Sequence, residues 1–206
     1  MVNKKKVGLD FHIEKQLGGV VIGIDEAGRG PLAGPVVAAA TIIPMLDIFI
    51  LLNDSKKLSK NIRERCFQLI QEHGRSAVGI AEVYEIEQLN ILQATLLAMR
   101  RAVDALDVQY DAIIVDGNIS PYPTKPDVIP IIGGDAKSLS IAAASIVAKV
   151  TRDKIMQKLH LEHPLYGWEQ NAGYGTAAHI NAIKRFGVSI HHRPSFCRKF
   201  ELPPNS

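Results

Sequence analysis

The sequence predicts an α/β protein in which a mixed β-sheet is flanked by helices and followed by a small helical C-terminal appendage. Short apolar runs of strand length occur in both halves of the chain, and long segments between them repeat apolar residues at helical spacing. The runs and helices do not alternate one by one, so a mixed sheet is favoured over a purely parallel one. The 206 residues suffice for one domain with a sizeable core.

The first half of the chain is expected to hold three strands and two helices. The strands fall on the apolar runs at residues 20–24, 36–43 and 77–83. Ser59 is placed to cap a helix that ends at His73, before Gly74. A longer helix is predicted from Ile86 to Leu106, because apolar residues recur there at steps of three and four.

The second half adds two strands and two helices. The strands are expected at residues 112–115 and 128–132. The first helix spans residues 138–159 and contains three consecutive alanines that allow close packing on a sheet, and the second spans residues 177–186 after Thr176 as its cap. These elements divide the chain into a main domain, residues 1–160, and a C-terminal helical appendage, residues 161–206.

Charge is unevenly distributed in a chain whose formal net charge is only +3. Residues 1–132 hold 14 lysines and arginines against 16 aspartates and glutamates, whereas residues 133–206 hold 10 against 5. A basic C-terminal third beside acidic residues further up suits a polyanion held against a metal-binding cluster. A solvated basic surface gives the same pattern, so charge alone does not decide between them.

The cysteines and the apolar segments limit the cellular locations in which the protein is expected. Cys66 and Cys197 are far apart and have no CxxC partner, which argues against a zinc–thiolate site and suits a reducing compartment. Residues 34–52 are apolar, but two prolines and an aspartate interrupt them, so we expect a strand, a turn and a second apolar piece rather than a membrane span. The expected protein is cytoplasmic and makes no membrane contact.

Four acidic residues stand at the ends of apolar runs. Asp25 and Glu26 follow the first run, Asp116 follows residues 112–115, and Asp135 lies between residues 128–132 and a helix. Strands that end in carboxylates can bring them together at one sheet edge, where they repel one another unless a cation joins them. Hard oxygen ligands suit Mg²⁺ or Mn²⁺. Each residue alone could be a turn or cap residue, but the shared placement favours a metal site.

A glycine-rich loop, residues 28–34, follows the first acidic pair and imitates a dinucleotide-binding loop. That function is disfavoured because Pro31 and Pro35 lead into another strand-like run, whereas a dinucleotide loop opens a helix. The bare backbone of Gly28, Arg29 and Gly30 can instead bring N–H groups close to a ligand oxygen. A simple tight turn is the alternative.

Seven stretches together resemble the motifs of bacterial type 2 ribonuclease H, the ribonuclease HII family. They occur in the family's order and cover residues 23–36, 54–59, 115–118, 134–138, 141–153, 173–176 and 192–196. No single stretch is specific, whereas the ordered set is. The resemblance implies a ribonuclease H-like fold and an endonuclease that hydrolyses the RNA strand of RNA–DNA hybrids. It also implies incision on the 5′ side of ribonucleotides embedded in duplex DNA.

The resemblance further implies two-metal-ion hydrolysis that yields 3′-hydroxyl and 5′-phosphate ends, with two Mg²⁺ or Mn²⁺ ions per active site. By motif, the catalytic carboxylates and metal ligands fall on Asp25, Glu26, Asp116 and Asp135, with Asp25 as the bridging ligand. Asp153, which lies within a helix, is the alternative to Asp135.

RNA must be distinguished from DNA through the 2′-hydroxyl. The resemblance assigns this contact to Gly28, Arg29 and Gly30, and it assigns recognition of the RNA–DNA junction to Tyr174. Several cations are candidates for phosphate contacts, which position a duplex without reading its sequence. These are Lys56, Lys57, Lys137, Lys149, Arg152 and Lys184. The expected partners are RNA–DNA hybrid and ribonucleotide-containing duplex DNA, bound by a monomer.

Three other functions were weighed: a non-catalytic hybrid-binding module, a metal-dependent phosphatase of small phosphate esters and a nicotinamide-dependent oxidoreductase. Acidic residues in a phosphate groove argue against the first, and the basic C-terminal third argues against the second. Zinc at the histidines is disfavoured because such a site needs three or four converging ligands. His192 is expected instead to fix the C-terminal segment through hydrogen bonds.

Overall fold

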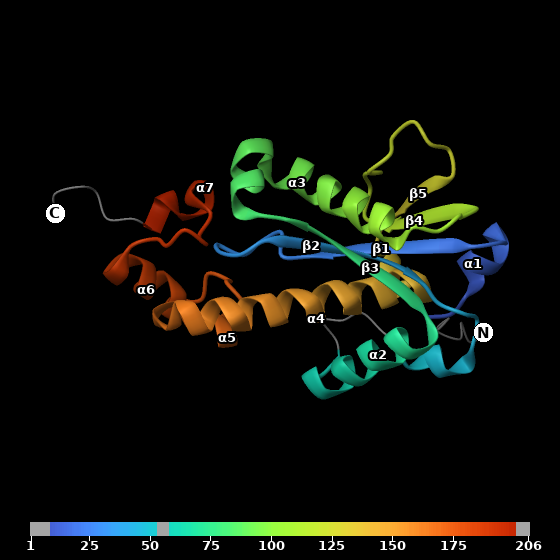
Figure 1. Cartoon of the computed structure of the whole chain (residues 1–206), viewed down its shortest axis with the longest axis horizontal. Coiled ribbons are helices and arrows are strands. Elements are labelled where there is room, and N and C mark those ends of the chain that lie inside the picture. Colours follow the sequence, from blue (N-terminus) through green and yellow to red (C-terminus); the bar gives the residue numbers. More distant parts are fainter. Residues whose placement is uncertain (1–8, 53–57, 201–206) are drawn as a thin grey trace, which may run out of the picture.

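A mixed five-stranded sheet forms the centre of the computed structural model, which describes residues 9–52 and 58–200. Its strands are β1 (Val21–Ala27), β2 (Val36–Ile42), β3 (Arg75–Ala81), β4 (Ala112–Asp116) and β5 (Val128–Ile131). The order across the sheet is β3-β2-β1-β4-β5 (Figure 1). Strand β2 is antiparallel to both of its neighbours, whereas β1, β4 and β5 are parallel. The predicted mixed sheet is therefore confirmed.

Helices cover both faces of the sheet (Figure 1). Helix α3 (Val83–Leu106) packs on one face, α4 (Leu139–Glu162) packs on the other, and α2 (Lys60–His73) lies against α4. The alternation of side chains along β1 explains the layers, since Ile22 and Ile24 are fully buried in the core beneath α3. A side chain at Gly23, on the opposite face, would overlap the backbone at Ser140, so glycine permits the close approach of α4.

The predicted cap of α2 is present, since the Ser59 hydroxyl accepts a hydrogen bond from the N–H of Ile62. Residue 138 was predicted as the first residue of its helix, whereas Ser138 caps α4 and accepts from the N–H of Ile141. Thr176 caps α6 (Ala177–Phe186), which ends at Gly187 as expected. Each cap satisfies a backbone donor that the first helical turn leaves without a partner.

Several elements differ from the prediction. Strand β1 extends to Ala27, so Asp25 and Glu26 lie inside it, and α3 starts three residues earlier than expected. The third strand starts and ends two residues earlier than expected, because Glu82 and Glu85 form a capping box that starts α3 at Val83. Helix α1 (His12–Leu17) was not predicted at all. Its buried Glu14 accepts hydrogen bonds from the Ser138 hydroxyl, at 2.7 Å, and from the Ser140 N–H, at 2.9 Å. The helix therefore depends on a tertiary contact that local periodicity does not reveal.

The apolar segment 34–52 forms β2, a turn and the short 3₁₀ helix η1 (Asp47–Leu51), as predicted. Within the described ranges, no helix combines the length and the apolar character that a membrane span requires.

The C-terminal elements cluster at one end of the sheet, around the end of α4 (Figure 1). They are η3 (Pro164–Tyr166), α5 (Trp168–Asn171), α6, α7 (Pro194–Cys197) and η4 (Arg198–Phe200). A β-bridge joins Ala33, which follows β1, to His192. Helix α4 continues past residue 160, so the proposed domain boundary lies inside one helix, and the division stays a prediction.

Candidate active site

Two parallel strands bring the first carboxylates together. Strands β1 and β4 pair in register up to Ile24 and Val115, and the next residues are Asp25 and Asp116. Both acidic residues lie on the face of the sheet that α4 covers, because side chains alternate along each strand. Ser145 of α4 makes a side-chain hydrogen bond with Asp25, so the helix contributes to the site directly. This serine was not predicted as a site residue, although it lies within the motif at 141–153.

Asp25 is 5 % exposed, and its surroundings disfavour its negative charge. Burial raises the pKa of its carboxyl well above the usual value, and the charges of Glu26 and Asp116 raise it further. The backbone N–H of Glu26 donates to Asp25 at 2.7 Å, which opposes the shift only in part. In the described part of the chain, no lysine or arginine pairs with Asp25. A proton on Asp25 or a cation bound between the carboxylates would relieve this unfavourable charge.

The other two acidic residues border this pair. The N–H of Gly134 donates to Asp116 at 2.7 Å, which places the following residue, Asp135, beside the β4 carboxylate. Asp135 lies in the 3₁₀ helix η2 (Gly134–Ala136), after β5. Glu26 is partly buried, and its carboxylate lies 3.3 Å from the Arg29 guanidinium. All four predicted acidic residues thus lie at the same end of the sheet.

A cleft of about 350 Å³ opens next to Glu26. It is lined by Glu26, Ala27, Gly28, Arg29, Gly30, Ser145, Lys149 and Tyr174. The side chain of Tyr174 is exposed, and its ring carbon Cε1 lies 3.8 Å from the position that a Cβ atom at Gly30 would occupy. The structure therefore brings the predicted glycine loop and the predicted tyrosine together in one cleft.

A smaller hollow of about 190 Å³ continues from this cleft along α4, with Lys149 at the junction. Lys60, Gln157 and Gln170 contribute to its lining. Cationic and amide side chains suit phosphate and sugar oxygens.

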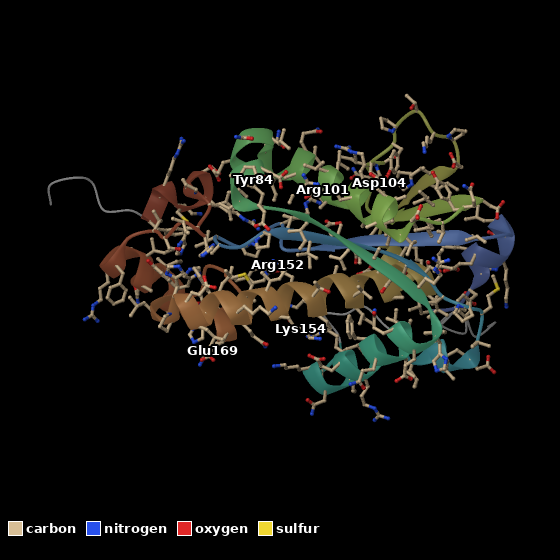
Figure 2. All side chains as sticks on the ribbon, viewed as in Figure 1. Tyr84, Arg101, Asp104, Arg152, Lys154 and Glu169 are labelled. Carbon is tan, nitrogen blue, oxygen red and sulfur yellow. The ribbon has the colours of Figure 1, made fainter. Side chains whose placement is uncertain are left out.

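The prediction that Arg152 contacts phosphate is wrong. It is 1 % exposed, and its guanidinium binds the backbone carbonyls of Ala33, Pro35 and Ala172 at 2.9–3.0 Å. Figure 2 shows Arg152 directed towards the sheet, whereas Lys154 lies on the outer side of α4. The sequence pattern gave no sign of this difference, since both residues are cations on one predicted helix.

The remaining predicted cations have different surroundings. Lys149 lines the cleft and donates to Asp153 at 2.8 Å, and Lys184 is exposed on α6. Lys137 donates to the carbonyl of Ile132 at 2.6 Å, in the loop that carries Asp135. Lys56 and Lys57 lie outside the described residues.

Asp153 is engaged away from the four carboxylates. Besides its bond to Lys149, its carboxylate lies 3.9 Å from the Arg63 guanidinium of α2. The position favours Asp135 over Asp153 as the fourth acidic residue of the site.

Four of the seven histidines fall into two groups. His192 hydrogen-bonds to His179 and Ser189, so the prediction that it fixes the C-terminal segment is confirmed. Separately, Glu162, His163 and His191 place possible ligand atoms within 4.8 Å of one another, although Glu162 is exposed. His160 lies elsewhere, 3.5 Å from Glu169.

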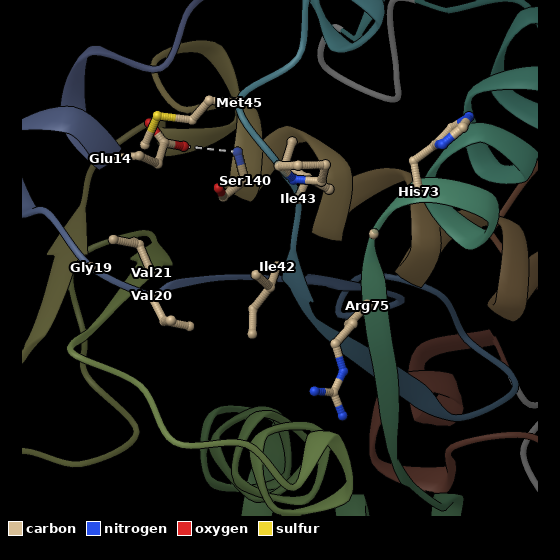
Figure 3. Close-up of a pocket in the computed structure, with 12 residues that line it drawn as sticks. Glu14, Gly19, Val20, Val21, Ile42, Ile43, Met45, His73, Arg75 and Ser140 are labelled. Atoms are coloured by element: carbon tan, nitrogen blue, oxygen red, sulfur yellow. Dashed lines mark hydrogen bonds between the residues drawn. The ribbon is translucent and has the colours of Figure 1, made fainter.

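A second hollow of about 350 Å³ lies at the other end of the sheet, where β1 begins (Figure 3). Its walls include Val20, Ile42 and Met45, and Glu14 is hydrogen-bonded to Ser140 at its edge. None of the four candidate carboxylates lines it. The hollow is therefore separate from the candidate active site.

Comparisons with known proteins agree with this arrangement. The family model described as Ribonuclease HII matches residues 22–199. A ribonuclease HII of Wolbachia pipientis wMel is 50 % identical over 188 residues, which are 91 % of this chain and 94 % of the relative. A ribonuclease HII of Paramagnetospirillum magneticum is 53 % identical over 191 residues, with the same shares of both chains.

Solved structures show the same fold. The ribonuclease H2 of Pyrococcus horikoshii OT3 has a TM-score of 0.70 and 28 % identity, covering 88 % of this chain and 97 % of that one. The structure of a PCNA:RNase HII complex from Archaeoglobus fulgidus contains a chain with a TM-score of 0.75, at 23 % identity, covering 90 % of this chain and 98 % of that one. The family match and the close relatives both cover most of the sequence. The chain therefore belongs to the ribonuclease HII family of endoribonucleases, which act on RNA–DNA hybrids.

Proposed function

We propose that this endonuclease incises duplex DNA on the 5′ side of embedded ribonucleotides, besides hydrolysing the RNA strand of hybrids. Asp25, Glu26, Asp116 and Asp135 are the proposed ligands of two divalent cations, Mg²⁺ or Mn²⁺. The observation that supports this most is the buried Asp25, whose carboxylate is close to those of Glu26 and Asp116 and has no lysine or arginine partner within the described residues. An all-oxygen donor set of this charge fits hard divalent ions.

Bound cations would neutralise the charge of the scissile phosphate and would lower the pKa of a bound water molecule. The protein's own residues then have distinct tasks. Asp25 and Asp116 would hold the cations at the ends of β1 and β4, and the Ser145 hydrogen bond holds the Asp25 carboxylate in one orientation. Attack of water on phosphorus breaks the bond to the 3′ oxygen, which gives 3′-hydroxyl and 5′-phosphate ends.

Recognition of the ribonucleotide is proposed to occur in the cleft beside Glu26. The backbone of Gly28, Arg29 and Gly30 lies on one side and Tyr174 on the other, which suits a contact with the 2′-hydroxyl and stacking on the adjoining sugar. Lys149 stands where the cleft continues along α4, so it is the proposed phosphate contact for the bound duplex. Substrate binding by the C-terminal residues is proposed through Tyr174.

Its cellular setting is a further part of the proposal. Both cysteines are buried and form no disulfide within the described residues, which suits a reducing compartment, and we propose a cytoplasmic monomer that acts in ribonucleotide excision repair and replication.

The decisive experiment uses a labelled DNA duplex that contains one ribonucleotide. Incision on its 5′ side is measured with Mg²⁺, with Mn²⁺ and without a divalent ion, and an all-DNA duplex and Asp116→Asn serve as controls. We expect metal-dependent incision that is lost in the variant. Cleavage of long hybrids alone would contradict the repair activity, and full activity of Asp116→Asn would contradict the proposed metal site.

A further inference from the structure

Arg193 lies behind the glycine loop and is fully buried, and its guanidinium donates hydrogen bonds only to backbone carbonyls in the described structure. Its Nε atom donates to Gly34 at 3.0 Å, and its terminal nitrogens bind Gly28 at 2.6 Å, Arg29 at 3.0 Å, Pro31 at 2.9 Å and Gly34 at 2.7 Å. One side chain thus makes five hydrogen bonds to four carbonyls of a single loop.

Neighbouring groups bind most of the loop's other carbonyls. The backbone N–H of Arg193 donates to Leu32 at 2.8 Å, and Arg152 binds the carbonyls of Ala33 and Pro35, each at 3.0 Å. Seven of the eight successive carbonyls from residue 28 to residue 35 are therefore hydrogen-bonded, the exception being Gly30. The loop conformation is fixed from behind by two arginines rather than by its own turn geometry.

The direction of these carbonyls determines the direction of the N–H groups. In a planar trans peptide unit, the carbonyl of one residue and the N–H of the next point in opposite directions. With the carbonyls of Gly28 and Arg29 held by Arg193, the N–H groups of Arg29 and Gly30 point away from the guanidinium. Within the described residues, those two N–H groups donate to no protein acceptor, and both residues line the cleft beside Glu26.

Hydrogen bonds to the same loop and to Arg152 also hold the segment that carries Tyr174. The N–H of Leu32 donates to the carbonyl of Gly173 at 2.8 Å, and Arg152 binds the carbonyl of Ala172 at 2.9 Å. The carbonyl of Tyr174 lies 2.9 Å from the Nδ1 atom of His179. A shift of the glycine loop would therefore also displace the segment that carries Tyr174.

We propose that Arg193 is a positioning residue for ribonucleotide recognition, which turns the N–H groups of Arg29 and Gly30 towards the 2′-hydroxyl by binding the carbonyls behind them. The inference rests on the proposed role of the glycine loop. It extends that role to a residue of the C-terminal segment that need not touch the substrate.

The test compares Arg193→Lys with the wild-type enzyme in Mg²⁺. A lysine keeps the charge but has three donors on one nitrogen, so it cannot reproduce five hydrogen bonds in a planar fork. The measured quantities are kcat and KM for a duplex with one ribonucleotide, and the inhibition constant of the same duplex made only of DNA. Arg75→Lys is the matched control, because Arg75 is exposed at the start of β3, away from the cleft.

In the wild-type enzyme, we expect the inhibition constant of the DNA duplex to exceed KM for the ribonucleotide duplex. Arg193→Lys should raise KM roughly tenfold, the effect of one or two lost hydrogen bonds, and should leave the inhibition constant of DNA within about twofold. A general loss of folded protein would lower the apparent kcat and leave both constants unchanged. An unaltered ratio of the two constants in Arg193→Lys would overturn the inference, while the loop's proposed role would survive.

Equal constants for the two duplexes in the wild-type enzyme would instead refute the loop's role, and the inference with it. If Arg193→Lys does not fold, the wild-type protein still provides a test by NMR. The Nε–H of Arg193 should exchange with solvent far more slowly than that of Arg75, and the amides of Arg29 and Gly30 should shift with the ribonucleotide duplex but not with DNA. Equal exchange of the two side chains would overturn the inference.

Discussion

Lowering the pH should destabilise the protein through the buried pair His179 and His192. The N–H of Ser189 donates to Nδ1 of His192 at 2.9 Å, so the ring proton of His192 is on Nε2, which lies 3.0 Å from Nε2 of His179. His179 directs Nδ1–H to the carbonyl of Tyr174, and its Nε2 also accepts from Trp168 at 3.1 Å. Both rings are therefore neutral, and a second proton on either would face an existing N–H donor.

The size of the effect follows from the pKa of His192. Burial, and next the proximity of His179, lower this pKa from 6.5 to about 4. Between these values the unfolded chain binds more protons than the folded one, so the free energy of unfolding falls as the pH falls through this window. For His192 alone, the loss between about pH 7.5 and pH 5 is at most about 2 kcal/mol.

Urea unfolding at these two pH values tests the reasoning, with His192→Gln beside the wild-type protein. The variant should be less stable at the higher pH, because it loses the ring hydrogen bonds, but its disadvantage should shrink by up to about 2 kcal/mol at the lower pH. Asp25, whose raised pKa acts in the opposite sense, is common to both proteins and cancels in the difference. His73→Gln, at an exposed position of α2, is the control. Equal losses in wild type and His192→Gln would refute the neutral pair.

Three further predictions concern the cleft and its carboxylates. Asp25→Asn should abolish incision. It should also raise the thermal midpoint of the metal-free enzyme, by about 2–4 °C for each kcal/mol of relieved repulsion among the carboxylates. An unchanged or lower midpoint in calorimetry would contradict this repulsion. Tyr174→Phe and Tyr174→Ala should both slow cleavage at a single ribonucleotide, the alanine more, and equal rates on all substrates would remove this residue from recognition. Gly28→Ala should destabilise the fold by more than about 2 kcal/mol, because φ at Gly28 is +97° and the added carbon would overlap Arg152. Gly30→Ala should change the free energy of unfolding by less than about 1 kcal/mol. Similar unfolding curves for the two variants would be inconsistent with a loop that the arginines hold in place.

Local patterns were sufficient for most of the fold. The polar caps at Ser59 and Thr176 and the apolar runs of the five strands each act within a few residues, so a single sequence reveals them. Helix α1 escaped prediction because its stability depends on the contact between Glu14 and the start of α4, far away in the sequence. The start of α3 was misplaced because the apolar Val83 extends a strand-like run that the capping box interrupts.

The candidate site was predictable to the extent that it follows strand ends. Carboxylates at the ends of parallel strands must meet at one edge, which accounts for Asp25 and Asp116. No such rule distinguishes an arginine that binds phosphate from one that binds carbonyls. Arg152 was therefore assigned to the substrate, although it belongs to the framework behind the glycine loop.

The two buried arginines also change how the positive charge of the C-terminal third is interpreted. Arg152 and Arg193 account for two of its ten cations, yet neither can make a phosphate contact while its guanidinium binds backbone carbonyls. Burial lowers the pKa of both side chains, and the charge of Arg152 lowers the pKa of Arg193 further. Their charges still act through the loop, since low-dielectric surroundings screen them less than water does. The N–H groups of Arg29 and Gly30 therefore have positive charge behind them, on a loop that lines the cleft beside Glu26.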